Sequence, residues 1–278
     1  MTRRLPRHMA LAGRTAVVTG AASGIGRAIA VSLSRRGCHL ALADLDAPGL
    51  EQTAVLARRE ALRVTCHALD VADRRAVAAF PDRVRAGHPG VDLLVNNAGV
   101  AVGGSFEHVS EEDFDWLMSI NFFGVVQMTR AFLPLLRASD DARLVNLSSI
   151  FGIIAPPGQT AYVASKFAVR GFSESLRHEL EGSTTVGVTV VHPGGVRTAI
   201  SDNARLPRDL SPAEAARRRA SFKRALKLPP AVAGETIVRG IERRQARVLV
   251  GSDARVASLI ERLVPVAYWR LIGSRVGK

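Results

Sequence analysis

The chain is poor in cysteine and in aromatic residues, and it contains no long apolar run. Its two cysteines, Cys38 and Cys66, show no Cys-x-x-Cys spacing, so we expect buried thiols and no metal site. No stretch reaches the ~18 uninterrupted apolar residues of a membrane span. No apolar run of signal-peptide length follows Arg3, Arg4 and Arg7, and we therefore expect a cytoplasmic protein without a secretory leader.

Acidic residues are outnumbered, because 38 Lys and Arg stand against 25 Asp and Glu, for a formal charge of +13. The excess is concentrated in residues 1–8, 205–227 and 239–278, and the rest of the chain is slightly acidic. The low aromatic content of 5% and the lack of a recognised motif argue against nucleic acid as a partner. Two interpretations of the basic segments remain open: solvated helices, or attraction to an anionic membrane surface.

Apolar runs typical of buried strands alternate with helical patterns along the chain. The alternation predicts an α/β fold of Rossmann type, a doubly wound parallel sheet of about seven strands with helices on both faces. A length of 278 residues suits a single domain over residues 1–278. The two longest helical patterns cover residues 111–137 and 158–181. The expected strands lie near residues 14–19, 39–43, 63–68, 91–95, 142–148, 186–191 and 247–250.

A glycine-rich turn, TGAASGIG at residues 19–26, joins the first expected strand to a helical stretch. Its glycines let the backbone turn tightly and approach a ligand, and the helix N-terminus offers unpaired N–H groups to a pyrophosphate. Eighteen residues after Gly26, the second strand ends at Asp44, whose carboxylate can bind a ribose diol and repels a 2′-phosphate. We therefore expect NAD as the cofactor ahead of NADP, with Arg27 and Arg35 as the cations that could reach the same ribose.

A tyrosine and a lysine four residues apart, Tyr162 and Lys166, fall within one expected helix, and Ser149 precedes the tyrosine by thirteen residues. A spacing of four places both side chains on the same helix face. Tyrosine ordinarily titrates near ~10, and a neighbouring cation in a poorly solvated cleft favours the phenolate. We therefore expect Lys166 to lower the pKa of Tyr162 and make the phenol an acid or base near neutral pH.

These features occur in order with NNAG at residues 96–99, Asn121, YVASK at residues 162–166 and PGGVRT at residues 193–198. Together they resemble the short-chain dehydrogenase/reductase (SDR) family across residues 12–200. The resemblance implies that Tyr162 is the acid/base, and that Lys166 lowers its pKa and binds the nicotinamide ribose. It also implies that Ser149 holds the substrate oxygen and that Asn121 anchors a water molecule of a proton relay.

The resemblance further implies the remaining ligand contacts. Asp70 and Val71 would contact the adenine, Asn97 and Gly99 would shape the floor beside the nicotinamide ribose, and residues 193–198 would line the carboxamide. The candidate cofactor-binding residues are Gly20, Ser23, Gly24, Ile25, Gly26, Asp44, Leu45, Asp70, Val71, Asn97, Ala98, Gly99, Tyr162, Lys166, Pro193, Gly194, Val196 and Thr198. The candidate substrate contacts are Ser149, Ile150, Phe151, Tyr162 and Gly195.

Residues 199–230 form the segment that such proteins use as a substrate lid. A serine followed by a proline, Ser211 and Pro212, predicts the start of a helix within it. The residues that could form the inner face of this helix are Ala215, Phe222, Ala225 and Leu226.

The near wall of the pocket is expected to be apolar, since it consists of Ile150, Phe151, Ile153, Ile154 and Pro156. Arg197 and Arg205 are the only residues there that could pair with a charged substrate, and we expect both to be surface arginines. A hydrophobic alcohol or ketone is therefore favoured over a sugar or an acidic metabolite, without the sequence indicating which one.

The C-terminal residues 251–278 depart from the short glycine-rich tail of many tetrameric SDR relatives. Val256, Leu259, Ile260 and Leu263 form one apolar stripe of a helix, which we expect to pack on its own domain rather than to face a partner or a membrane. Pro265 then interrupts the helix. We expect the tail to cover the substrate entrance, and the possibility of peripheral membrane contact stays open.

The sequence thus predicts an NAD-dependent oxidoreductase that interconverts a hydrophobic secondary alcohol, of lipid, steroid or retinoid type, and its ketone. Two alternatives are a 3-oxoacyl-carrier-protein reductase, whose basic patches would dock an acidic carrier, and a non-catalytic cofactor-binding scaffold. The resemblance implies a homodimer or homotetramer through the helices that carry Asn121 and Tyr162, with a self-complementary interface.

Overall fold

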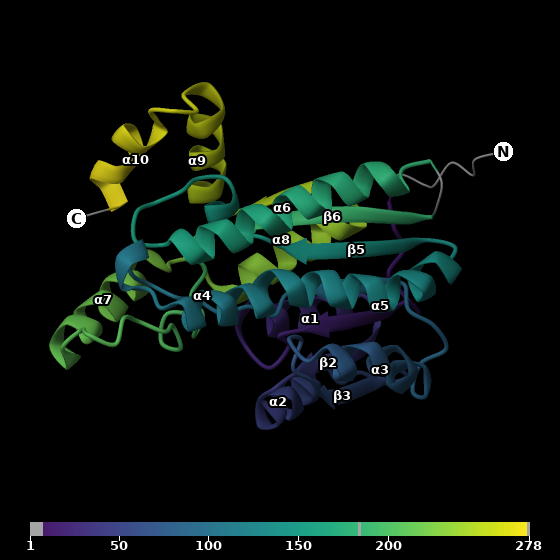
Figure 1. The fold of residues 1–278 in the computed structure, drawn as a ribbon. Helices are drawn as coiled ribbons and strands as arrows, with labels where there is room; N and C mark the ends of the chain where they lie inside the picture. The colour runs from purple at the N-terminus through teal and green to yellow at the C-terminus, as the bar shows by residue number, and fades with distance from the viewer. Residues whose placement is uncertain (1–7, 183–184, 277–278) are drawn as a thin grey trace.

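The computed structural model describes residues 8–182 and 185–276. The basic N-terminal segment that carries Arg3, Arg4 and Arg7 lies outside the described residues, as do residues 277–278. A parallel sheet crosses the centre of the molecule in the order β3-β2-β1-β4-β5-β6-β7 (Figure 1). Its strands are β1 Thr15–Thr19, β2 His39–Asp44, β3 Val64–Ala68, β4 Leu93–Asn96, β5 Ala142–Leu147, β6 Val186–Pro193 and β7 Arg247–Val250. The predicted sheet is confirmed, and every strand lies close to its expected range.

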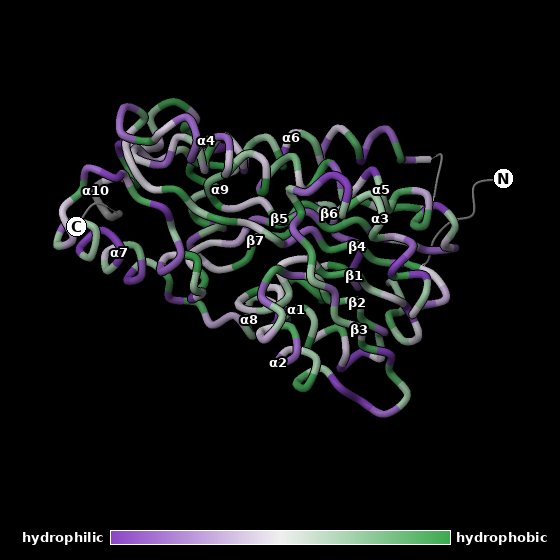
Figure 2. The backbone as a smooth tube through the Cα atoms, turned by 60° about the horizontal axis from the view of Figure 1, so that its bottom comes forward, coloured by the Kyte–Doolittle hydropathy of each residue, from purple (hydrophilic) through white to green (hydrophobic). Residues whose placement is uncertain are grey.

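Helices cover both faces of this sheet, and each face has its own apolar core (Figures 1 and 2). Helices α1, α2 and α8 pack on one face, with Ile29, Leu33 and Ile237 fully buried. Helices α3, α5 and α6 cover the other, around the rings of Phe80 and Phe132, which meet edge to face. The helices are α1 Gly24–Ser34, α2 Ala47–Ala57, α3 Arg74–Arg85, α4 Glu111–Met118, α5 Gly124–Ala138, α6 Thr160–Leu180, α7 Pro212–Ala225, α8 Pro230–Glu242, α9 Ser252–Leu263 and α10 Tyr268–Val276.

The strand order changes direction between β1 and β4, because β2 and β3 follow β1 on one side and β5 to β7 follow β4 on the other. In such sheets ligands bind beyond the carboxyl ends of the strands at this switch point. The loops that follow β1, β4, β5 and β6 carry Gly20, Asn97, Ser149 and Gly194, so the candidate site residues meet at one edge.

The helical pattern expected over residues 111–137 is divided in the structure. A π-helical turn, η2 Ser119–Phe123, separates α4 from α5 and carries Asn121. Turns of this kind insert an extra residue and often occur at functional sites. The pattern over residues 158–181 is a single helix, α6, as expected.

Residues 199–230 contain the predicted helix, α7, which lies at the surface of the protein. Ser211 and Glu214 form a capping box at the start of α7, which supports the predicted N-terminus. Within α7 only Ala215 and Phe222 are half-buried, and Leu226 just beyond the helix end is half-buried as well, so three of the four predicted residues lie on the less exposed side of the helix. Ala225 is exposed, contrary to the expectation, and no residue of α7 is fully buried. The ion pair of Lys223 with Asp202 adds a polar contact to the preceding loop.

The stripe on α9 faces the opposite way from the expectation. Ala254 and Ala257 are the buried residues of α9, whereas Val256, Leu259 and Leu263 are 53%, 58% and 71% exposed. Small alanine side chains let α9 approach the sheet closely, so Val256, Leu259 and Leu263 point outward. Ile260, the fourth residue of the predicted stripe, is half-buried. None of the described helices is long and apolar enough to cross a membrane.

Candidate active site

Tyr162 and Lys166 lie one turn apart near the start of α6, as their spacing predicts. The Lys166 Nζ atom is 5.5 Å from the centroid of the Tyr162 ring and donates a hydrogen bond to the Leu147 carbonyl at 3.2 Å. Lys166 is buried at 5% exposure, although it carries an amine. A buried amine beside a phenol at the carboxyl end of β5 is unusual outside functional sites.

Burial dominates the protonation of this pair. It raises the pKa of Tyr162 to about 12, and the hydrogen bond with Ser149 offsets this only in part. Burial also lowers the pKa of Lys166 to about 8. The expectation that the pKa of Tyr162 lies below its usual value is thus reversed in this structure, because the loss of solvent outweighs the hydrogen bond with Ser149. At neutral pH the pair is therefore a neutral phenol beside an ammonium group.

Ser149 follows β5 and begins the short 3₁₀ helix η3 Ile150–Gly152. Its Oγ atom accepts a hydrogen bond from the Phe151 N–H at 3.1 Å and hydrogen-bonds the Tyr162 phenol. The preceding Ser148 hydroxyl donates to the Lys166 carbonyl at 2.8 Å, which fastens η3 to α6. The hydroxyl groups of Ser149 and Tyr162 are therefore held side by side.

Asn121 is fully buried, and its carboxamide clamps the loop after β4. Its Oδ1 atom accepts from the Val100 N–H at 2.8 Å, and its Nδ2 atom donates to the Val100 carbonyl at 3.0 Å and to the Ser165 hydroxyl at 3.2 Å. A Cβ atom at Gly99 would lie 3.2 Å from Asn121 Oδ1 and 3.5 Å from Lys166 Nζ. The loop therefore passes between Asn121 and Lys166, which brings all four candidate catalytic residues to one place.

The glycine-rich turn has the shape that a phosphate site requires. Gly20 and Gly24 have φ angles of +64° and +54°, a region that favours glycine. A side chain at Gly20 would meet Asn97 Nδ2 at 2.7 Å, and one at Gly24 would meet the Thr198 side chain at 2.9 Å. Ser23 caps α1 without a side-chain hydrogen bond, and the first turn carries no acid. The N–H groups at this helix end can therefore bind an anion, so the turn fits a pyrophosphate.

The Asn97 side chain holds the glycine-rich turn through two hydrogen bonds. Its Nδ2 atom donates to the carbonyls of Thr19 and Gly20 at 2.9 and 3.0 Å. The Thr19 hydroxyl in turn accepts from the N–H groups of Asn97 and Ala98. The loops after β1 and β4 are thus joined into one unit.

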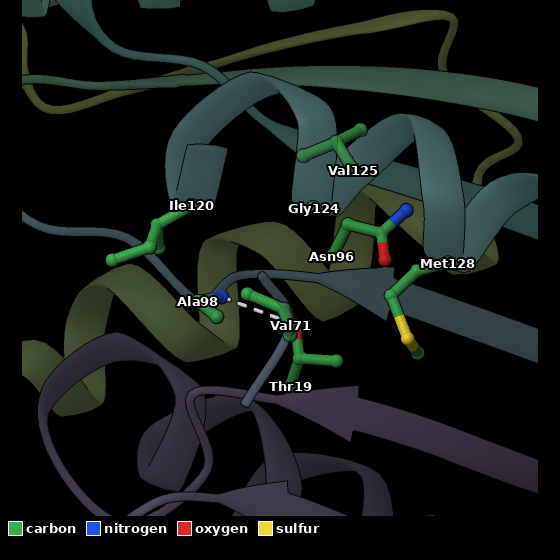
Figure 3. A pocket seen from close by; sticks show the side chains of 8 residues that line it. All are labelled: Thr19, Val71, Asn96, Ala98, Ile120, Gly124, Val125 and Met128. Carbon is green, nitrogen blue, oxygen red and sulfur yellow. Dashed lines mark hydrogen bonds between the residues drawn. The ribbon is translucent and has the colours of Figure 1, made fainter. Parts of the chain in front are cut away.

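Ala98 also borders a small, mostly apolar hollow beneath that unit (Figure 3). Val71, expected to contact the adenine, is buried there against Gly124, and the Asp70 carboxylate accepts from the Ala72 N–H. The residues that line the hollow are Thr19, Val71, Asn96, Ala98, Ile120, Gly124, Val125 and Met128.

Asp44 lies beside the glycine-rich turn, at the end of β2. Its carboxylate accepts from the Ala22 N–H at 3.0 Å and from the Asp46 N–H at 3.1 Å. No ion pair joins it to a basic side chain within the described residues. The Arg27 guanidinium bonds Thr53, Gln52 and the Ala22 carbonyl, and Arg35 caps the far end of α1. Leu45, the next residue, is largely exposed.

Residues 193–198 are held in place by an acid that the sequence analysis did not single out. The Asp253 carboxylate accepts a hydrogen bond from the Gly195 N–H at 2.6 Å. The Gly195 carbonyl accepts hydrogen bonds from the backbone N–H groups of Lys227 and Leu228 at 2.8 and 2.9 Å. Gly195 is thus a junction between the cofactor edge, the lid and α9. An acid in the first turn of α9 was the available signal in the sequence, and only the fold shows which loop it reaches.

The apolar wall packs with the C-terminal extension in one cluster. Ile153 and Ile154 are buried there with Ala257, Leu249, Tyr268 and Ile272, and Ile150 and Phe151 pack against the same cluster. Ile150 and Phe151 are half-buried, and the Phe151 ring meets the Tyr162 ring edge-on at 6.1 Å. The Tyr268 hydroxyl accepts from the Ala155 N–H at 2.8 Å, so the tail is attached to this wall.

Arg205 and Arg197, the two arginines near the wall, differ in their contacts and exposure. Arg205 pairs with Asp113 at 2.8 Å and stacks over the Trp116 ring at 3.6 Å. It is therefore engaged within the protein, while Arg197 is exposed. Arg197 is thus the surface arginine that we expected, whereas Arg205 is half-buried in contacts within the protein.

Comparisons with known proteins agree with this geometry. The family model described as short chain dehydrogenase matches residues 14–209. SadH of Mycobacterium tuberculosis, named as an oxidoreductase, is 44% identical over 268 residues, or 96% of each chain. The oxidoreductase UcpA of Escherichia coli K12 is 40% identical over 194 residues, which are 69% of this chain and 73% of UcpA.

Two solved structures are similar over most of the chain. A short-chain dehydrogenase/reductase from Burkholderia phymatum, in complex with NAD, superposes with a TM-score of 0.84 at 30% identity and covers 92% of this chain and 95% of its own. A metagenomic short-chain oxidoreductase in complex with NADP gives a TM-score of 0.70 at 29% identity over 87% and 98% of the two chains.

The fold, the site and these matches define an NAD(P)-binding oxidoreductase that acts on CH–OH groups. The chain belongs to the short-chain dehydrogenase/reductase family. The predicted family and fold class are therefore confirmed.

Proposed function

We propose that the protein interconverts a lipophilic secondary alcohol and its ketone, using NAD. The observation that carries this proposal is the contact of Tyr162, Ser149 and Lys166 beside a wall formed by Ile150 and Phe151. A phenol and a hydroxyl side by side can hold one substrate oxygen, and the apolar wall favours a substrate without charge.

The proposed reaction moves one hydride and one proton. A bound nicotinamide cofactor would supply the hydride acceptor for alcohol oxidation and the hydride donor for ketone reduction. In ketone reduction the neutral Tyr162 phenol donates its proton to the carbonyl oxygen, and in alcohol oxidation its phenolate accepts the hydroxyl proton. Ser149 donates a hydrogen bond to the same oxygen in both directions. The ammonium group of Lys166 stabilises the phenolate when it forms.

The proposed cofactor contacts follow the glycine-rich turn and Asp44. N–H groups at the start of α1 would hold the pyrophosphate, and Asp44 would accept hydrogen bonds from the adenosine ribose. Lys166 and Asn97 would border the nicotinamide ribose, and residues 193–198 would meet its carboxamide.

A panel of alcohols tests the substrate class. We expect kcat/KM with NAD to rise along a series of secondary aliphatic alcohols by about fourfold for each methylene that becomes buried. Steroid and retinoid alcohols should exceed sugars. A flat series, or a sugar as the best substrate, would contradict the proposal. NADPH-dependent turnover of acyl thioesters above all alcohols would favour the carrier-protein reductase, for which the exposed arginines of α7 offer a docking surface.

The same panel tests the role of the tail when it is run on a shortened chain. A truncation after Val264 removes α10 and keeps Asp253. A truncation after Val250 would also remove Asp253 and with it the hydrogen bond that holds Gly195. We expect KM for the lipophilic alcohols to rise and KM for NAD to stay unchanged. Tyr268→Phe, which removes only the hydroxyl bonded to Ala155, is the matched variant. Unchanged kinetics in a folded truncation would exclude the tail from the entrance.

We also propose a homodimer through the helices that carry Asn121 and Tyr162. Phe123 and Phe167 support it, since both are large apolar residues that remain exposed on η2 and α6. Light scattering should give about twice the 29.7 kDa of one chain. A single-chain mass over a wide concentration range would refute this assembly.

A further inference from the structure

The exposed residues of α9 form a surface of unusual composition. Val256, Leu259 and Leu263 lie on one outward face, called here the outer stripe, and Val266 beyond the helix end is 94% exposed. A folded domain has no need of four exposed aliphatic side chains in one continuous segment. Clustered apolar exposure of this kind marks an interaction surface.

Two arginines flank the outer stripe on the same helix. Arg255 precedes Leu259 by four residues and Arg262 follows it by three, so both lie beside it on the helix surface, and both are exposed. The two acids of α9 turn away from this face. Asp253 accepts from the Gly195 N–H, and Glu261 is half-buried and interacts with Arg247 on β7. The outward charge of α9 is therefore positive.

The same end of the molecule carries a second basic surface. Helix α7 has no buried residue and exposes Arg217, Arg218 and Arg224. Figure 1 places α7, α9 and α10 at one end, beyond the carboxyl ends of the strands, where the candidate active site lies. The outer stripe thus has cations beside it on α9, and a second group of cations on α7 lies at the same end of the molecule as the candidate active site.

We propose that the outer stripe of α9 binds an anionic lipid surface, with its leucines among the acyl chains and Arg255 and Arg262 at the headgroups. A helix with an apolar face and flanking cations lies in the plane of such an interface. A second copy of the chain fits less well, because a two-fold contact through α9 would place the same arginines against each other. The proposal extends the proposed function, since it places the entrance at the source of a lipophilic substrate.

Vesicle co-sedimentation tests the proposal without using turnover. The wild-type chain should bind vesicles of phosphatidylcholine mixed with phosphatidylglycerol, and bind more weakly to phosphatidylcholine alone or in high salt. Leu259→Ser with Leu263→Ser should lower the partition coefficient at least tenfold. Arg255→Gln with Arg262→Gln should lower it by about fivefold for each arginine, on anionic vesicles only.

Matched controls lie on α2, away from the entrance. Val55 and Leu56 are 65% and 51% exposed, so Val55→Ser with Leu56→Ser removes a comparable, somewhat smaller exposed apolar surface and should leave vesicle binding unchanged. Thermal unfolding and light scattering are measured on every variant.

Wild-type-like vesicle binding by the α9 variants overturns the proposal. So does a change in oligomer mass on Leu259→Ser with Leu263→Ser, which would assign the stripe to a second copy. Binding of an acidic protein but no vesicle overturns it as well. Vesicle binding without turnover of lipophilic alcohols would contradict only the proposed substrate.

Discussion

Replacing Tyr162 with phenylalanine is expected to lower kcat by about 10²–10⁴-fold while leaving the affinity for NAD nearly unchanged. The phenol hydroxyl is hydrogen-bonded to the Ser149 hydroxyl, and phenylalanine removes it but keeps the ring that packs against Phe151. Steady-state kinetics and a direct cofactor-binding titration measure the two quantities separately. If the phenylalanine variant keeps most of the wild-type turnover, Tyr162 is not the acid/base.

Two further variants sharpen this result. Lys166→Ala should lower both the rate and the cofactor affinity, because one ammonium group is proposed to serve the phenolate and the ribose. Ser149→Ala should lower the rate alone, since its hydroxyl faces the phenol.

The pH dependence of the same reaction has a definite sign. Burial raises the pKa of Tyr162 to about 12, so the phenolate is scarce at neutral pH and increases about tenfold with each pH unit. Alcohol oxidation, which uses the phenolate, should therefore accelerate as the pH rises from about 6 to 8. Above the lowered pKa of Lys166, about 8, the ammonium charge is lost and the increase should weaken. Ketone reduction uses the neutral phenol and should show no such rise.

The parts of the fold that follow from local patterns could be predicted from the sequence. Strands buried on both faces, such as Leu40 to Ala43 in β2, are continuous apolar runs, and the glycine-rich turn after β1 marks the switch point. Ser211 and Pro212 identify the start of α7, because capping is decided by neighbouring residues. The order of the motifs identifies the family, and the parallel sheet then brings their loops to one edge.

The parts that depend on contacts between distant segments could not be predicted. The period of the α9 stripe was evident, but whether leucines or alanines face the protein depends on how closely the helix approaches Ile153 and Ile154. The same applies to Asp253, which reaches Gly195 across the fold. The pKa of Tyr162 depends on burial, which a spacing of four residues does not reveal. In each case the tertiary packing decides between faces or partners that the sequence leaves equivalent.

Cofactor preference is the second large effect that we expect, with kcat/KM for NAD exceeding that for NADP by about tens- to thousands-fold. The Asp44 carboxylate is fixed beside the glycine-rich turn by the N–H groups of Ala22 and Asp46. A phosphate on the adenosine ribose would meet this negative charge. Arg27 could offset the repulsion only by leaving its bonds to Thr53 and Gln52.

Asp44→Asn should narrow this preference, because an asparagine keeps a hydrogen-bond acceptor for the backbone but removes the charge. Asp46→Asn is the matched control: it removes the same charge two residues away, where the carboxylate caps α2 through the Gly49 N–H rather than facing the ribose. We expect the ratio of kcat/KM for NAD over NADP to fall at least tenfold in the first variant and to stay within about twofold of wild type in the second. If the NAD over NADP ratio of kcat/KM is the same in both variants, residues other than Asp44 discriminate between the two cofactors. A wild-type preference for NADP would contradict the role of Asp44, because a cation that moves on binding would then have to compensate its charge. It would also favour the reductase alternative.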